Sequence, residues 1–290
     1  MHKPGSHPSH RSHAGMPAPA PRPRIRMVAI DLDGTLLSSR KTITPKTHTA
    51  IKAAAAAGIH IVLATARPPR SVRAYYHALN LDTPTVNYNG ALIWNEKLRQ
   101  IVEHCPLDVA VARKIIAWAR KQYPQTLVSV EILDKWYTDH YADIPEFLTE
   151  TAKQFTPDFI GPLDAFLRVP ITKLMLLGAP ARIVELERGI TAKFSKIVSQ
   201  TRSDAHMLQL MSPKTSKALA LAKIAALLGI PSAEVLAIGD APNDVDMLRW
   251  AGIAVVPENG WAQAKAVAHT LVPSNDDDGV AVALRKFVLD

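Results

Sequence analysis

The stretch Asp31-Leu32-Asp33-Gly34-Thr35 follows directly on a short apolar run, residues 25 to 30. That run is typical of a buried strand in a parallel sheet, and open α/β sheets bind their ligands at the carboxyl ends of such strands. A tight turn explains Gly34, but it does not require a carboxylate at Asp31. One of two carboxylates two residues apart can serve as nucleophile and metal ligand, and the other as general acid and base. For these five residues alone, an Asp-Gly turn that merely ends a strand remains the alternative.

Helices and strands alternate after this stretch and again towards the end of the chain. Before the middle of the chain we expect a helix at 45–57, strands at 59–64 and 85–87, and a hairpin at 91–103 that turns at Asn95-Glu96. Towards the end we expect helices at 216–228, 245–251 and 261–268 and strands at 235–238, 253–256 and 270–272. This alternation predicts an α/β fold with a mostly parallel sheet and helices on both of its faces.

The middle of the chain has a different pattern. It predicts helices at 107–122 and 181–194, strands at 126–132, 135–138, 172–177, 196–201 and 206–211, and a helix-and-loop stretch through Phe155. This is an α+β insertion between the two halves of the sheet. We therefore expect a disordered tail at 1–24, a catalytic core at 25–105 and 208–290, and a cap at 106–207.

Three further segments place polar groups at predicted strand ends or helix starts. Ala64-Thr65-Ala66-Arg67-Pro68 brings a hydroxyl, backbone N–H groups and a guanidinium, which suit phosphate oxygens. Lys217 stands at the start of a predicted helix, where its ammonium and the helix N-terminus both favour an anion. Gly239 to Asp244 adds Asp240, Asn243 and Asp244 after another apolar strand.

Each of these segments alone has an ordinary explanation as a turn, a helix start or a surface lysine. Together they deliver Asp/Asp, Thr/Arg, Lys and Asp/Asn/Asp to one edge of the same sheet. Four unrelated turns would not produce this set. The combination predicts a magnesium and phosphate site.

The chain resembles the haloacid dehalogenase superfamily, in particular its Cof-type phosphatases with a large α+β (C2) cap. The resemblance extends from about residue 26 to the C-terminus. It rests on the motifs at Asp31 to Thr35, Ala64 to Pro68, Asn89 to Ala91, Ser212 to Leu221, Gly239 to Leu248 and Ser274 to Val280. It implies a Rossmann-like, doubly wound core with the cap inserted.

The resemblance also implies a role for each matching residue. Asp31 would attack phosphorus, and Asp33 would protonate the leaving alcohol and then activate water. Mg²⁺ would be held by Asp31, the backbone carbonyl of Asp33, and Asp240, with support from Asp244. Phosphate would be bound by Thr65, the amides of Leu32 and Ala66, Lys217 and Asn243, and the rest of the substrate by Arg67 and Asn89. Relatives often have glycine where this chain has Lys214 and Glu258. This difference affects the geometry expected for the loops around the site.

Composition and charge indicate which classes of molecule the protein is expected to bind. The net charge is +8, but residues 1–24 supply +4 of it through Lys3, Arg11, Arg22 and Arg24. The remaining +4 is too weak and too scattered to predict nucleic-acid binding, and it suits a small phosphorylated metabolite. No apolar run reaches the roughly 18 residues that span a bilayer. A single cysteine and no secretory h-region favour the cytoplasm.

The leading hypothesis is a Mg²⁺-dependent phosphatase that forms a phosphoaspartate on Asp31. Sugar phosphates are the first expectation for its substrate, and phosphorylated cofactors such as pyridoxal phosphate or FMN the second. A sugar phosphomutase is the second enzymatic hypothesis, because capped relatives with both aspartates move phosphate within a sugar. A catalytically silent binding protein on the same fold is the third. The sequence does not indicate an oligomeric state.

Overall fold

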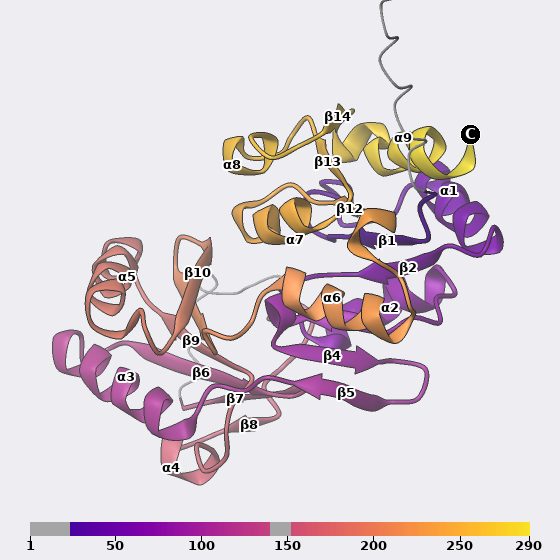
Figure 1. Cartoon of the computed structure of the whole chain (residues 1–290). Coiled ribbons are helices and arrows are strands. Elements are labelled where there is room, and N and C mark those ends of the chain that lie inside the picture. The colour runs from indigo at the N-terminus through magenta and orange to yellow at the C-terminus, as the bar shows by residue number, and fades with distance from the viewer. Residues whose placement is uncertain (1–23, 140–151) are drawn as a thin grey trace, which may run out of the picture.

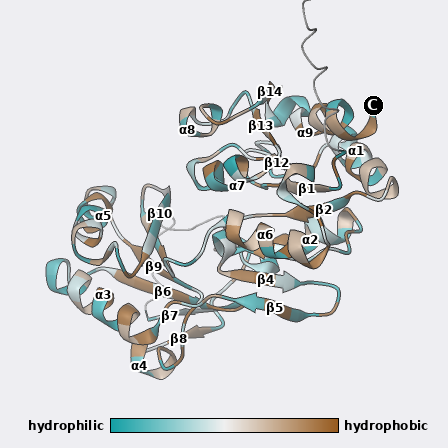
Figure 2. Cartoon of the chain, in the orientation of Figure 1, coloured by the Kyte–Doolittle hydropathy of each residue, from teal (hydrophilic) through white to brown (hydrophobic). Residues whose placement is uncertain are grey.

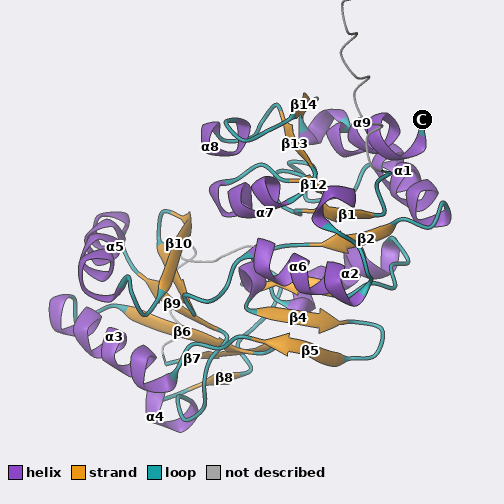
Figure 3. Cartoon of the chain, in the orientation of Figure 1, coloured by secondary structure: helices purple, strands orange, loops and turns teal. Residues whose placement is uncertain are grey.

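The computed structural model describes residues 24–139 and 152–290, and these include a five-stranded parallel sheet. Its strand order is β14-β13-β12-β1-β2, and every neighbouring pair is parallel (Figures 1 and 3). The strands are β1 (Met27–Ile30), β2 (His60–Leu63), β12 (Val235–Ile238), β13 (Ile253–Pro257) and β14 (Thr270–Val272). The predicted doubly wound α/β fold is therefore confirmed.

Both faces of this sheet are buried, as the continuous apolar runs of its strands predict. In β1, Val28 and Ile30 pack into one hydrophobic core, whereas Met27 and Ala29 pack into the other. Successive side chains of a strand point to opposite faces, so a strand covered on both sides must be apolar throughout. Figure 2 shows the apolar strands inside and the more polar helix faces outside.

Helices cover the two faces. One core includes residues of α1 (Pro45–Ala56), α2 (Pro69–Ala78) and α9 (Gly279–Leu284), and the other includes residues of α6 (Lys217–Leu227), α7 (Val245–Trp250) and α8 (Ala262–Lys265). No described helix is both long enough and apolar enough to cross a bilayer. Helix α2 was not predicted from the sequence. Pro68 is the residue before it and Pro69 is its first residue, where a missing N–H costs nothing.

A second, mixed sheet forms the inserted α+β part. Its order is β10-β11-β9-β6-β7-β8, antiparallel except for the β7–β8 pair. Helices α3 (Val109–Gln122) and α5 (Pro180–Phe194) pack on one face of it, and α4 (Leu163–Phe166) joins the same hydrophobic core. The strands are β6 (Leu127–Ile132), β7 (Lys135–Thr138), β8 (Phe159–Ile160), β9 (Lys173–Leu177), β10 (Ser199–Asp204) and β11 (Met207–Met211).

A three-stranded sheet connects the two parts. Its strands are β3 (Thr85–Asn87), β4 (Leu92–Asn95) and β5 (Gln100–His104), and the short helix η1 (Tyr88–Gly90) follows β3. An isolated parallel bridge between Ala64 and Val86 places β3 beside the end of β2. The predicted hairpin is present as β4–β5, although its turn lies between Asn95 and Gln100 rather than at Asn95-Glu96 alone.

The division into domains stays a proposal. Because β11 pairs with β9 and β10 of the inserted sheet, we propose that the cap runs from residue 106 through Met211 rather than ending at 207. The core would then be 25–105 and 212–290. The expected disordered tail at 1–24 lies outside the described residues except for Arg24. Much of the helix-and-loop stretch expected before Phe155 lies outside them as well.

Candidate active site

The site begins at the carboxyl end of β1, where the buried side chain of Asp31 meets Lys217. The Nζ atom of Lys217 donates to Asp31 Oδ1 at 2.5 Å and to Asp244 Oδ1 at 2.6 Å. Lys217 and Asp244 are fully buried, and Asp31 nearly so. The three groups come from β1, the start of α6 and the loop after β12, so the sheet topology brings together residues that are distant in sequence.

Helix α6 places Lys217 through its N-terminal cap. The hydroxyl of Ser216 accepts from the backbone N–H of Leu219, so that Lys217 becomes the first residue of the helix. Gly90, at a φ of +100°, lies against the carbonyl of Ser216, and a Cβ atom on Gly90 would overlap that carbonyl. Glycine at this position therefore lets the helix start approach η1.

Asp240 follows β12 and completes the acidic part of the site. One side-chain oxygen from each of Asp31, Asp240 and Asp244 can be chosen so that all three lie within 4.8 Å of one another. Thr35 donates to Asp240 Oδ1 at 2.8 Å, and Asp244 Oδ2 accepts the backbone N–H groups of Asp240 and Ala241 at 3.1 and 3.0 Å. Backbone N–H groups of the same loop therefore hold the carboxylate of Asp244 in place. The carboxylate of Asp240 accepts fewer hydrogen bonds than that of Asp244.

The balance of charge in this cluster favours a bound cation. Three buried carboxylates face one ammonium, and burial raises the pKa of Asp31 well above its ordinary value, with Asp244 and Asp240 adding to the rise against the opposing effect of Lys217. Burial and Asp244 likewise raise the pKa of Asp240 to about 6. Mg²⁺ prefers oxygen ligands, and carboxylate oxygens whose negative charge Lys217 does not fully neutralise suit it. The described residues donate no hydrogen bond to Asp31 Oδ2. The residues present therefore fit a divalent cation.

The side chain of Asp33 lies in a second, separate polar group. Arg67 grips it with Nε and Nη2 at 2.6 Å each, and Lys41 Nζ donates to Asp33 Oδ1 at 2.8 Å. Burial favours the neutral carboxyl, but Arg67 and Lys41 outweigh it and hold the pKa of Asp33 below its ordinary value. The carboxylate of Asp33 is not part of the acidic cluster, and only its backbone remains for the metal contact expected from the sequence.

The expected phosphate-binding groups line the same edge of the sheet. Among the described residues, the backbone N–H groups of Leu32 and Ala66 have no hydrogen-bond partner, as donors reserved for a ligand would have. Thr65 is buried, and its hydroxyl accepts from the N–H of Arg67 at 3.1 Å. Asn243 Nδ2 donates to Asn89 Oδ1 at 2.9 Å, so a phosphate-binding candidate and a substrate-binding candidate already touch.

Two residues of the site were missed by reasoning from the sequence. Thr35 was quoted in a motif but given no role, although a hydroxyl four residues after Asp31 was a usable signal. Lys41 carried no signal, because a lone lysine in a polar loop is by default a surface residue. Arg67, which the resemblance assigned to the substrate, pairs with Asp33 in the structure, and its role towards a substrate stays a prediction.

The sequence matches the family described as haloacid dehalogenase-like hydrolase over residues 28–284. The 5-amino-6-(5-phospho-D-ribitylamino)uracil phosphatase YitU of Bacillus subtilis is 30% identical, with 90% of this chain and 97% of that protein covered. The pyridoxal phosphate phosphatase YbhA of Escherichia coli is 26% identical, with 88% and 96% covered.

Solved structures resemble the whole fold. A haloacid dehalogenase-like hydrolase from Bacteroides thetaiotaomicron matches with a TM-score of 0.81 at 22% identity, covering 91% of this chain and 99% of that one. TM0651 from Thermotoga maritima matches with a TM-score of 0.79 at 23% identity, covering 92% and 100%. At these identities the likeness concerns the fold alone.

Proposed function

Because this chain belongs to the haloacid dehalogenase-like hydrolases, we propose that it is a Mg²⁺-dependent phosphatase that cleaves a small phosphomonoester through a phosphoaspartate on Asp31. A hydrolase acting on phosphate esters follows from the family relationship, since relatives such as YitU are named phosphatases. The metal, the covalent intermediate and the residue roles are the parts that we propose.

One observation carries the proposal: Asp31, Asp240 and Asp244 converge around the ammonium of Lys217 at the carboxyl end of the sheet. A phosphoryl group bound beside Asp31 would meet Lys217, the unpaired amides of Leu32 and Ala66, and the hydroxyl of Thr65. Such fixed donors stabilise the charge that a transferring phosphoryl group spreads over its oxygens. Asp31 is then placed to attack phosphorus while the ester oxygen leaves.

Asp33 is proposed as the acid and base of the reaction. Its pairing with Arg67 and Lys41 keeps it ionised in the free protein, which suits the second step, where it takes a proton from the attacking water. In the first step it must carry a proton to the leaving alcohol. We therefore infer that its pairing with these two cations loosens when substrate is bound.

Mg²⁺ would be held by Asp31, the backbone carbonyl of Asp33 and Asp240, with Asp244 holding the loop around Asp240 in place. When bound, the cation would neutralise charge on the carboxylates and on the phosphoryl oxygens. Burial, with Asp244 and Asp240 nearby, raises the pKa of Asp31, and a bound cation would oppose that rise.

The leaving group is proposed to be a small metabolite, and a cytoplasmic location is proposed with it. YitU and YbhA are named for phosphate esters of a ribitylaminouracil and of pyridoxal. These names favour a phosphorylated cofactor or cofactor precursor for this chain over the sugar phosphate that we expected first.

The test is a phosphate-release screen with Mg²⁺ over pyridoxal 5′-phosphate, FMN, 5-amino-6-(5-phospho-D-ribitylamino)uracil and hexose phosphates. We expect turnover of at least one ester, loss of activity in EDTA, and recovery on adding Mg²⁺. The Asp31→Asn variant is the matched blank. Turnover of none of these esters would contradict the proposal. A requirement for a bisphosphorylated activator would indicate a mutase instead.

A further inference from the structure

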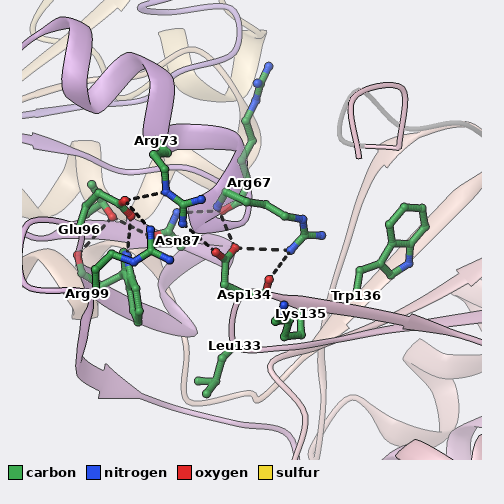
Figure 4. A network of polar contacts seen from close by, with 12 residues as sticks. Arg67, Arg73, Asn87, Glu96, Arg99, Leu133, Asp134, Lys135 and Trp136 are labelled. Carbon is green, nitrogen blue, oxygen red and sulfur yellow. Dashed lines mark hydrogen bonds and ion pairs between the residues drawn. The ribbon is translucent and has the colours of Figure 1, made fainter. Parts of the chain in front are cut away.

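A polar cluster, partly buried at its arginines and at Asp134 and buried at its other members, lies where the β6–β7 hairpin of the cap meets α2 and the β3–β4 region of the core. We call it the cap-docking cluster; it consists of Arg70, Arg73, Tyr88, Glu96, Glu131 and Asp134. Figure 4 shows Arg73 between Glu96 of the core and Asp134 of the cap. The corresponding distances are 2.7 Å from Arg73 Nε to Glu96 Oε1 and 3.1 Å from Arg73 Nη2 to Asp134 Oδ2.

Arg70 makes the most contacts across this junction. Its Nη2 donates to Glu131 Oε1 at 2.8 Å, its Nη1 to the carbonyl of Asp134 at 3.2 Å, and its backbone N–H to Asp134 Oδ1 at 2.8 Å. The side chains of Arg70 and Glu131 are only 8% and 3% exposed. Water therefore reaches the Arg70–Glu131 pair poorly, and the charge of Arg70 depends on partners in the other part of the protein, whereas Glu131 also faces Lys173 within the cap.

Glu131 also holds η1. The hydroxyl of Tyr88 lies 3.1 Å from Glu131 Oε2 and 2.6 Å from the carbonyl of Leu133. Tyr88 and the next residue, Asn89, both have left-handed backbones, with φ of 50° and 53°. Two consecutive non-glycine residues in this region are strained, and such strain persists only where surrounding contacts hold it. The cap supplies two of the contacts that hold Tyr88.

The two core segments that the cap holds are those that carry candidate site residues. Helix α2 begins two residues after Arg67, whose guanidinium grips Asp33, and η1 contains Asn89, which accepts from Asn243. When the β6–β7 hairpin packs on Arg70 and Tyr88, it therefore holds in place the residues that contact Asp33 and Asn243.

We propose that Arg70 and Tyr88 are positioning residues, which dock the β6–β7 hairpin on the core and thereby hold Arg67 and Asn89 in the arrangement that binds substrate. This role rests on the proposed phosphatase function. Neither residue touches the reacting atoms. Loosening the dock lowers the fraction of molecules that are ready to bind, and substrate at saturation restores that fraction.

Two conservative variants test the role. The side chain in Arg70→Lys cannot reach both Glu131 and the carbonyl of Asp134, whereas the backbone N–H of residue 70 keeps its contact with Asp134 Oδ1. Tyr88→Phe removes only the hydroxyl. Losing a buried hydrogen bond to a charged group is expected to speed amide hydrogen exchange at residues 88–91 and 131–136 about ten-fold in the ligand-free protein. With substrate, we expect KM to rise about ten-fold while kcat changes less than about two-fold.

Lys135→Gln is the matched control, because Lys135 lies next to Asp134 but pairs with Asp158 inside the cap. It should leave both exchange and KM unchanged. A merely structural defect would lower kcat through loss of active protein and leave KM as it was. Unchanged exchange in both variants, or an unchanged KM, overturns the proposal. The exchange measurement needs no substrate, so it decides the docking even where the proposed phosphatase activity fails.

Discussion

The ammonium of Lys217 lies 2.5 Å from the carboxylate of Asp31, although 186 positions separate the two residues in the chain. Lys217 is also the one cation that contacts Asp244, and the described residues bring no other lysine or arginine within ion-pair distance of Asp31, Asp240 or Asp244. The site therefore holds more negative than positive charge until ligands arrive. That excess underlies the first two predictions below.

Asp31→Asn should lower kcat by at least about a thousand-fold, because the amide is a poor nucleophile toward phosphorus. The fold should remain, since the amide is nearly isosteric and Lys217 keeps Asp244 as its partner. Phosphate release and the thermal midpoint measure the two effects. Activity that persists in a folded variant would place the nucleophile on another residue.

Lys217→Met should lower the free energy of unfolding by about 3–5 kcal/mol in EDTA, because it leaves Asp31 and Asp244 buried without their cation. Lys223→Met is the control on the same helix. Lys223 pairs with Glu103 in an exposed contact, so its loss should cost at most about 1 kcal/mol. If urea denaturation gave the same loss of unfolding free energy for Lys217→Met and Lys223→Met, the burial of Asp31 and Asp244 around Lys217 would contribute nothing to stability.

Gly34→Ala should disturb Asp240. Gly34 has a φ of +83°, and a Cβ atom there would lie 2.5 Å from Asp240 Oδ2. Gly58 has a φ of +82° with no atom within 4 Å of such a Cβ, so Gly58→Ala carries the backbone strain without the clash. We expect about 1 kcal/mol of destabilisation at Gly58, and a larger loss at Gly34 together with weaker Mg²⁺ binding. Calorimetric titration with Mg²⁺ would show it, and identical affinities in the two variants would refute it.

Lys173 makes stability depend on pH in alkaline solution. It lies opposite Glu131 across the β6–β9 pair, and burial lowers its pKa from 10.5 to about 8. Between these values the unfolded chain binds more protons than the folded protein. The free energy of unfolding due to this residue should therefore rise with pH across the window, by about 3 kcal/mol in total.

The measurement is urea denaturation of the wild type and of Lys173→Met at several pH values from 7 to 11. Tyrosines and other lysines titrate in the same range, so the difference between the two proteins is the relevant quantity. The free energy of unfolding of the wild type should rise relative to that of Lys173→Met as pH increases. A difference independent of pH would show that Lys173 keeps an ordinary pKa in the folded protein.

The strands of the core sheet could be predicted from the sequence because the signal for each strand lies within the strand itself. Its strands are buried on both faces, and continuous apolar runs that end in aspartate or threonine mark both a strand and its ligand-binding end. Helix α2 was not accessible in this way, because the pair Pro68-Pro69 reads equally as a stop and as a start. Only the burial of Val72 and Tyr76 in the core decides between them.

The sequence by itself determined which chemical groups are available: the carboxylates after β1 and β12, the hydroxyl and guanidinium after β2, and the lysine at the start of α6. The tertiary structure alone decided how they pair. It placed Arg67 and Lys41 on Asp33, left a single ammonium among Asp31, Asp240 and Asp244, and set Arg70 against Glu131 of the cap. The physical reason is that the energy of a charge depends on its distance to other charges and on its exclusion from water, and folding creates both.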